Sequence, residues 1–539
     1  MAKSQLFASL RRMVTDARVA RERNVSLETV SDWRAAAREQ KSGVTRRQFV
    51  RGGAAAAAAG ALFSTNANAA NPKPTIAIVG AGIAGLNCAL ELKDRGYAST
   101  IYEAQPARVG GRMHSNVGHF NQGQVSEFCG ELIDTGHYTI RDLADRFNLP
   151  MTNLLGAQPA GSEDTFYFDG QYYPRAQANI DFMPVYDVLV DQVRAAGYPT
   201  TYNVSKAAGR ELDLISVYEW IAQYVPGGHS SPMGQLLDVA YEEEYAASTQ
   251  VQSSLNLIYL LAYQPDPDYW EVFGESDEKF HIIGGNDKLP HAIANHLGPD
   301  MIKMGHALTK VKRLSDGRYR LSFAGKPDVT VDRAVLCIPF TILRTLDIAE
   351  AGFDDLKRYA IDNLGAGVTA KIALQFNTRL WNQPGPWGLS NGNVYSDTGL
   401  QNTWDVTRGV AGSNGVMVDY TGGPYSSTFK TTTPYAREGN AKVRQDAARF
   451  LAQLEPILPG ITAQWNGKAA CSLAHLDPYL KTSYSHWKVG HYQTYVGYEG
   501  VRQGNCLFAG EHTSVDYQGF MEGGAISGKA AAKDIINGG

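Results

Sequence analysis

The residues from Gly80 to Gly85, read as Gly-Ala-Gly-Ile-Ala-Gly, have the spacing of a turn that holds a phosphate group. Glycine at 80 permits a tight turn, glycine at 82 lets the backbone approach a pyrophosphate, and glycine at 85 lets a helix and a strand pack closely. Glu103 follows about twenty residues later, where a carboxylate accepts hydrogen bonds from ribose hydroxyls. This spacing predicts a dinucleotide site and leaves FAD and NAD as alternatives.

The segments around the turn can position these residues. Residues 75–79 have the composition of a buried strand, residues 86–93 that of a helix, and residues 99–102 that of a second strand ending at Glu103. The N-terminus of the helix offers unpaired N–H groups and a positive dipole end to phosphates. Because strand, helix and acidic residue all agree, the glycine spacing is not a chance match.

Composition limits the class of protein. The chain has 539 residues, enough for two or three domains, with 44% hydrophobic and 19% charged residues. A net charge of −4 gives no reason to expect a nucleic-acid partner. The five cysteines are scattered without a CxxC pair, which argues against a zinc site and a disulfide framework and favours small buried apolar residues. The histidines have no convincing ligand spacing, so no metal is expected.

Residues 45–69 contain Arg46 and Arg47, an almost purely Gly and Ala run over 52–62, and Ala67-Asn68-Ala69. This order resembles a twin-arginine export signal covering residues 1–69, cleaved after Ala69. A basic helix followed by an Ala-rich linker is the alternative. The apolar run is shorter than the roughly 20 residues that span a bilayer, so no stable membrane span is expected. The signal predicts a periplasmic or secreted protein, exported already folded with its cofactor loaded.

A second Gly-rich segment, residues 108–112, reads Arg-Val-Gly-Gly-Arg and follows Glu103 closely. With this segment the chain resembles the flavin-containing amine oxidases, which include monoamine, polyamine and L-amino-acid oxidases. The resemblance implies an α/β fold with a Rossmann-like FAD-binding domain, built from separated segments, and an α+β substrate-binding domain. The expected boundaries are 70–136, 281–344 and 481–539 for the FAD-binding domain, and 137–280 and 345–480 for the substrate-binding domain.

The resemblance also implies which residues bind FAD. Glycines 110 and 111 and Arg112 would lie at the pyrophosphate, Glu131 beside the isoalloxazine, Leu308 at the adenine, and Glu511 near the ribityl chain. The full expected set is Gly80, Gly82, Ile83, Ala84, Gly85, Glu103, Ala104, Gly110, Gly111, Arg112, Gly130, Glu131, Leu308, Gly510, Glu511, Phe520, Met521 and Ala525. Ser483 stands where mammalian monoamine oxidases have a flavin-linking cysteine, so non-covalent FAD is expected.

Three residues carry the catalytic expectations. In the family pattern Lys371 would hold a water against flavin N5, whereas the alternative is an ordinary strand lysine reaching solvent. Tyr484 and Phe520 would stand on either side of the substrate amine. Ala474 falls near the place of a family tryptophan. The acidic run over 241–245 could bind a cation, but successive helical residues point about 100° apart, so a solvated helix face is favoured.

These residues predict FAD-dependent oxidative deamination of a primary or secondary amine, whether monoamine, diamine or polyamine. The products would be an imine and then an aldehyde, with O2 reduced to hydrogen peroxide. Three alternatives stay open: an L-amino-acid oxidase, which would need an arginine in the pocket; a dehydrogenase with another electron acceptor; and a non-enzymatic FAD-binding partner protein. The Gly-Pro-Met-Arg element of many L-amino-acid oxidases is missing after Arg112. The sequence does not determine the oligomeric state, and a homodimer is one expectation.

Overall fold

A five-stranded parallel sheet is assembled from segments that lie far apart in the chain. In spatial order its strands are β22 (Cys506–Phe508), β13 (Arg333–Leu336), β1 (Ile76–Val79), β2 (Thr100–Tyr102) and β9 (Ile302–Lys303). Every residue of β1 is buried, as a parallel sheet covered on both faces requires. The sheet confirms the predicted α/β class, because strands and helices alternate around one nucleotide-type turn.

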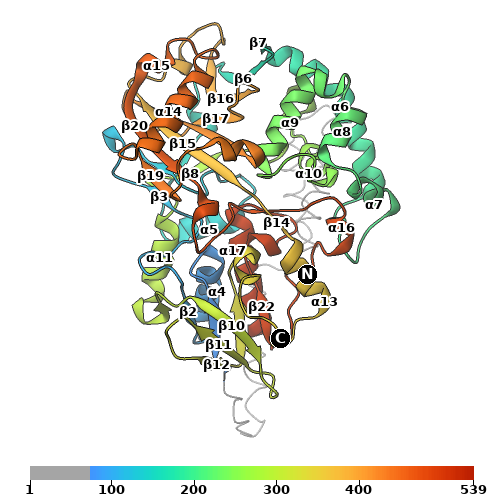
Figure 1. The fold of residues 1–539 in the computed structure, drawn as a ribbon, viewed down its shortest axis with the longest axis vertical. Helices are drawn as coiled ribbons and strands as arrows, with labels where there is room; N and C mark the ends of the chain where they lie inside the picture. The colour runs from blue at the N-terminus through green and yellow to red at the C-terminus, as the bar shows by residue number, and fades with distance from the viewer. Residues whose placement is uncertain (1–72, 539) are drawn as a thin grey trace, which may run out of the picture. The chain divides into compact units, whose positions relative to one another are not determined.

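Two helices from opposite ends of this fold pack against each other. Helix α4 (Ile83–Asp94) follows β1, and α17 (Met521–Ile536) is the last helix; they lie side by side in Figure 1, in blue and red. A Cβ atom on Gly528 would lie 2.0 Å from the carbonyl oxygen of Ala84, so the helices could not cross this closely with a larger residue there. Helices α5 (Tyr138–Arg146) and α11 (Lys288–Leu297) pack on this pair.

The second large sheet has eight strands. In order they are β19 (Tyr435–Arg437), β20 (Trp465–Ser472), β15 (Thr369–Phe376), β18 (Gly415–Gly422), β17 (Asn402–Asp405), β16 (Ser390–Ser396), β6 (Glu163–Phe168) and β7 (Gln171–Tyr173). All eight residues of β15 are buried, and β15 pairs antiparallel with β18 and β20. Lys371 therefore lies in the interior of the sheet rather than at an edge.

A group of helices accompanies the eight-stranded sheet, and one of them, α9, packs on β16 and β18. The group consists of α6 (Arg175–Ala196), α7 (Ala207–Asp213), α8 (Val217–Tyr224), α9 (Pro232–Glu244) and α10 (Ser254–Leu261). Ser231 caps α9 by accepting a hydrogen bond from the Gly234 N–H, and proline occupies the first helical position. The position of α9 matters because its last residues face the candidate site.

The remaining elements are short. A three-stranded antiparallel sheet consists of β10 (Leu308–Arg313), β11 (Tyr319–Phe323) and β12 (Val329–Val331). The small pairs are β3 (Ser115–Asn116) with β4 (Ser126–Glu127), β5 (Met151–Asn153) with β8 (Phe280–Ile282), and β14 (Gly365–Ala366) with β21 (Ser485–His486). The other helices are α12 (Phe340–Leu343), α13 (Asp355–Asn363), α14 (Ala441–Leu454), α15 (Ile461–Gln464) and α16 (His491–Thr494).

The computed structural model describes residues 73–538. The predicted twin-arginine signal and its cleavage site after Ala69 lie outside the described residues. Within 73–538 no helix has both the length and the apolar character needed to cross a membrane. The domain boundaries expected from the sequence stay a prediction.

Candidate active site

A cavity of about 450 Å³ is lined by residues from both large sheets. Of the residues expected at the site, those that line the cavity are Gly80, Gly82, Ile83, Ala84, Glu103, Ala104, Gly110, Gly111, Arg112, Gly130, Glu131, Leu308, Lys371, Tyr484, Gly510, Glu511, Phe520 and Met521. Gly85 and Ala525 are not part of the lining. Gly524 lines the cavity in place of its neighbour Ala525, whose carbonyl oxygen accepts a hydrogen bond from Asn87.

The glycine turn has the shape of an anion cradle. Gly80 adopts φ +104°, which favours glycine, and a Cβ on Gly85 would lie 2.0 Å from the Gly80 carbonyl oxygen. No atom lies within 4 Å of the place a Cβ on Gly82 would take. Helix α4 begins without a side-chain cap and without an acidic residue in its first turn, so its first N–H groups are available to an anion. These features fit the pyrophosphate of FAD.

Glu103 is held beside that turn. Its carboxylate accepts hydrogen bonds from the Ala81 N–H at 2.6 Å and from the Gln105 N–H at 2.7 Å. Burial raises the pKa of Glu103, and the two N–H groups partly oppose that effect. The carboxylate therefore braces the glycine turn from the end of β2, and its contact with ribose stays a prediction.

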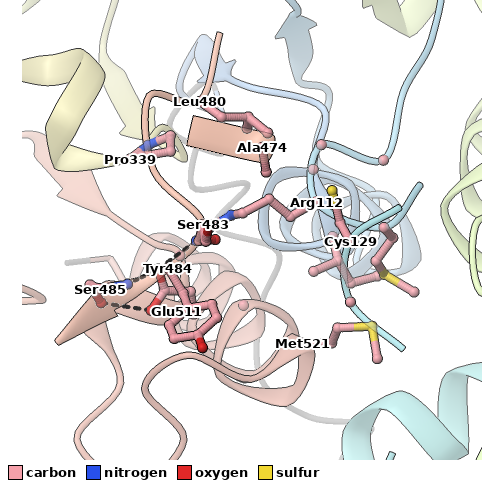
Figure 2. A pocket seen from close by; sticks show the side chains of 18 of the residues that line it. Arg112, Cys129, Pro339, Ala474, Leu480, Ser483, Tyr484, Ser485, Glu511 and Met521 are labelled. Atoms are coloured by element: carbon pink, nitrogen blue, oxygen red, sulfur yellow. Dashed lines mark hydrogen bonds and ion pairs between the residues drawn. The ribbon is translucent and has the colours of Figure 1, made fainter. Parts of the chain in front are cut away.

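Arg112 and Glu511 form an ion pair of 2.7 Å between Nη1 and Oε1. Arg112 Nη1 also donates to the Ser483 carbonyl oxygen at 3.1 Å, and Glu511 Oε2 accepts from the Ser485 hydroxyl at 2.7 Å (Figure 2). Burial alone would raise the pKa of Glu511, but the charge of Arg112 holds it below its usual value. The pair ties the second Gly-rich segment to the C-terminal segment. The flavin contacts expected of both residues stay predictions.

Lys371 and Glu131 form a second buried ion pair inside the cavity. Their exposed fractions are 4% and 8%, so neither side chain reaches bulk solvent, contrary to the ordinary behaviour of a strand lysine. The indole Nε1 of Trp404 donates to Glu131 Oε1 at 2.9 Å. Sequence reasoning missed Trp404, which lies on β17 without any recognisable motif.

Tyr484 and Phe520, the two aromatic residues expected on either side of the substrate amine, both line the cavity. The Tyr484 hydroxyl donates to the Glu243 carbonyl oxygen at 2.9 Å, and the Tyr420 hydroxyl donates to Tyr484 at 3.0 Å. Phe520 stands immediately before α17 and packs on His137, with 5.1 Å between the centroids of the two rings. Tyr420 was not anticipated. It lies on β18 directly opposite Lys371, so only strand register could have identified it.

The prediction that residues 241–245 form a solvated helix face is wrong. Glu243 is 2% exposed and accepts from Asn402 Nδ2 at 2.9 Å, and both Glu243 and Glu244 line the cavity. The reason is tertiary packing: α9 packs on β16, β17 and β18, and its last turn lies at the cavity instead of facing solvent. Only Glu242 behaves differently, binding Gln401 away from the cavity lining.

Glu278 completes an acidic cluster, defined here as Glu243, Glu244 and Glu278. It lines the cavity and adopts φ +46°, a conformation rare for residues other than glycine and concentrated at functional sites. Its N–H donates to Asp134 Oδ1 at 3.0 Å. Burial raises the pKa of all three carboxyl groups, that of Glu278 to about 8. Among residues 73–538, neither Glu244 nor Glu278 has a side-chain hydrogen-bond or ion-pair partner.

Four features bear on which other reactions and cofactors the cavity could support. Within residues 73–538 no group of His, Cys, Asp or Glu side chains is arranged to hold a metal ion. All five cysteines are free; three are buried as expected, whereas Cys129 and Cys337 line the cavity. The arginines of the lining are Arg108 and Arg112, both from the Gly-rich segment. Ala474, which falls near the place of a family tryptophan, lines the cavity (Figure 2).

The family model for flavin containing amine oxidoreductase matches residues 83–536. The chain belongs to this family. It is an enzyme acting on CH–NH2 or CH–NH groups, and the family confirms that the predicted cofactor is a flavin. Ser483 offers no sulfur for attachment and agrees with FAD held without a covalent bond.

Individual relatives are distant. The putative L-amino-acid oxidase YobN of Bacillus subtilis (strain 168) is 23% identical over 494 residues, which cover 85% of this chain and 94% of that protein. Lysine-specific histone demethylase 1 homolog 2 of Arabidopsis thaliana is 24% identical over 86% of this chain, which spans only 58% of that protein. The solved structure of putrescine oxidase bound to putrescine has a TM-score of 0.72 at 18% identity, covering 86% of this chain and 99% of that one. These likenesses agree with the fold described above.

Proposed function

We propose that this enzyme oxidises a diamine or polyamine. One nitrogen would react between Tyr484 and Phe520, and a second, protonated nitrogen would bind the acidic cluster. The observation that carries the proposal is that the Glu244 and Glu278 side chains line the cavity and form no ion pair among the described residues. Buried carboxylates are costly unless a cation pairs with them.

The reacting nitrogen must be neutral before its α-carbon can lose a hydride equivalent. With a pKa of about 10.4, removing its proton near pH 7.4 costs about 4 kcal/mol, at about 1.36 kcal/mol per unit. Tyr484 and Phe520 supply a desolvated pocket that disfavours the cation. The acidic cluster provides the opposite environment for the other nitrogen. FAD, when bound, supplies the two-electron acceptor.

The proposed overall reaction balances with water and O2. The amine carbon is oxidised to an imine, and water converts the imine into an aldehyde with release of ammonia or a smaller amine. O2 takes the two electrons and two protons and becomes hydrogen peroxide. Lys371 is the residue proposed to hold a water at the flavin.

L-Amino-acid oxidation is the second candidate, because of the similarity to the putative enzyme of Bacillus subtilis. A substrate carboxylate would need a free guanidinium, but Arg112 is paired with Glu511 and Arg108 donates to the Gly111 carbonyl oxygen. The three carboxyl groups of the acidic cluster offer that carboxylate no positive charge. The lining therefore favours a diamine or polyamine over an L-amino acid as the substrate.

The test is to mix the anaerobic holoenzyme with monoamines, diamines, polyamines and L-amino acids, and to follow the loss of flavin absorbance. Diamines or polyamines should reduce the flavin faster than monoamines of equal chain length. Preference for L-amino acids would refute the proposal. Admitting air afterwards and assaying peroxide separates an oxidase from a dehydrogenase that uses another acceptor.

We also propose that the protein is exported by the twin-arginine route, on the strength of Arg46, Arg47 and the Ala67-Asn68-Ala69 site. Mass spectrometry of protein recovered outside the cytoplasm should give a terminus at Ala70. An intact Met1 terminus in that fraction would contradict cleavage.

A further inference from the structure

The carboxylate of Glu131 uses both of its oxygen atoms inside the cavity. Oε2 pairs with the Lys371 ammonium, and Oε1 accepts the hydrogen bond from Trp404. Lys371 Nζ lies 5.1 Å from the centre of the Trp404 ring, and it also donates to the Cys129 carbonyl oxygen at 3.4 Å. The ammonium is therefore held from several directions, which a flexible lysine side chain does not achieve alone.

The backbone of Glu131 is fixed as firmly as its side chain. Asn286, which is fully buried, donates from Nδ2 to the Glu131 carbonyl oxygen at 2.6 Å and to the Gly130 carbonyl oxygen at 3.1 Å. Trp404 and Lys371 lie on β17 and β15, which both pair with β18. Three separate segments thus hold Glu131, two at its carboxylate and one at its backbone.

We propose that Glu131 is a positioning residue for Lys371 rather than a direct flavin contact. Its carboxylate would hold the Lys371 ammonium at the flavin side of the cavity and balance its charge, while Trp404 holds the carboxylate in place. This inference rests on the proposed function only in assigning Lys371 to the flavin. The pair is neutral as a whole, so removing the Glu131 carboxylate leaves an uncompensated positive charge, and removing the Lys371 ammonium leaves an uncompensated negative charge.

The reduction potential of bound FAD tests this directly, since flavin gains negative charge on reduction. At mildly alkaline pH, Glu131→Gln should raise the potential because an unbalanced ammonium remains. Lys371→Met should lower it because an unbalanced carboxylate remains. Trp404→Phe keeps both charges and an aromatic side chain but loses the indole N–H that holds the carboxylate, so it should shift the potential less than either of the other two variants. Shifts of the first two variants in the same direction, or no shift in Glu131→Gln, would overturn the proposal.

Two further measurements separate positioning from direct contact. Glu131→Gln should keep its full FAD content, whereas loss of FAD would return Glu131 to a direct flavin contact. After photochemical reduction, which needs no amine, reoxidation by air should slow by about tenfold or more in Glu131→Gln and in Lys371→Met. Glu131→Gln should add nothing in the Lys371→Met background. An equal further loss in that background, or unchanged rates in both single variants, would overturn the proposal whatever the substrate proves to be.

Discussion

The Tyr484 hydroxyl donates a hydrogen bond of 2.9 Å to the main-chain carbonyl oxygen of Glu243. This bond joins an aromatic wall of the proposed reaction site to the acidic cluster at the end of α9. In the proposed binding mode, the protein would therefore fix the separation between the oxidised carbon and a second charged nitrogen. A site of this kind should discriminate among diamines by chain length.

Tyr484→Phe removes that hydrogen bond but keeps the ring. We expect KM for the preferred diamine to rise by about 2- to 12-fold, from the loss of about 0.5–1.5 kcal/mol, with a smaller change in kcat. Steady-state kinetics with diamines of different lengths is the measurement. A monoamine serves as the control substrate, and an equal rise in its KM would show that the hydroxyl does not act through the acidic cluster.

Glu244→Gln removes one carboxylate from the cavity without changing its shape. The loss of a hydrogen bond to a charged group, about 1.5–3 kcal/mol, should raise KM for a diamine by about 10- to 150-fold and leave a monoamine unaffected. Glu242→Gln is the matched control, because the neighbouring Glu242 binds Gln401 and does not line the cavity. Equal effects of both substitutions would contradict the assignment.

The pKa of Glu278, raised by burial to about 8, predicts a pH dependence of selectivity. Below pH 8 the free enzyme holds this carboxyl group protonated and neutral, so a second ammonium gains less from it. The ratio of kcat/KM for a diamine to that for a monoamine should therefore rise as pH increases through about 8. In Glu278→Gln this rise should disappear, and a ratio with the same pH profile in both enzymes would count against the prediction.

Two alanine substitutions in the glycine turn should have separable effects. Gly85→Ala places a methyl group against the Gly80 carbonyl oxygen and should lower the free energy of unfolding by about 1–3 kcal/mol or more. Gly82→Ala meets open space, so the fold should be unaffected while FAD affinity falls. Urea unfolding and the flavin content of purified protein measure the two effects. Equal FAD retention in Gly82→Ala and the parent would contradict a phosphate contact there.

Glu103→Ala should release FAD more readily. The carboxylate accepts from the Ala81 and Gln105 N–H groups, so its removal loosens the turn as well as any ribose contact. The ratio of flavin to protein absorbance after gel filtration measures this loss. A fully yellow variant would show that neither contribution is needed.

Features that depend on residues adjacent in the sequence were predictable from it. The glycine turn, β1 and α4 form one continuous stretch. The acidic cluster was not predictable, because it depends on where α9 ends and on Glu278, which lies in a separate loop. The pairing of Lys371 with Glu131 and of Arg112 with Glu511 was also not predictable, because the members of each pair lie hundreds of residues apart in the sequence.

Because α4 and α17 cross closely, the folded site depends on segments from both ends of the described chain. The turn that begins α4 is synthesised well before β22 and α17. A chain truncated before β22 would lack one edge of the parallel sheet, the Glu511 partner of Arg112 and the helix packed on α4. The proposed FAD site would therefore be complete only after β22 and α17 have been made and folded, which would suit the proposed export of an already folded protein.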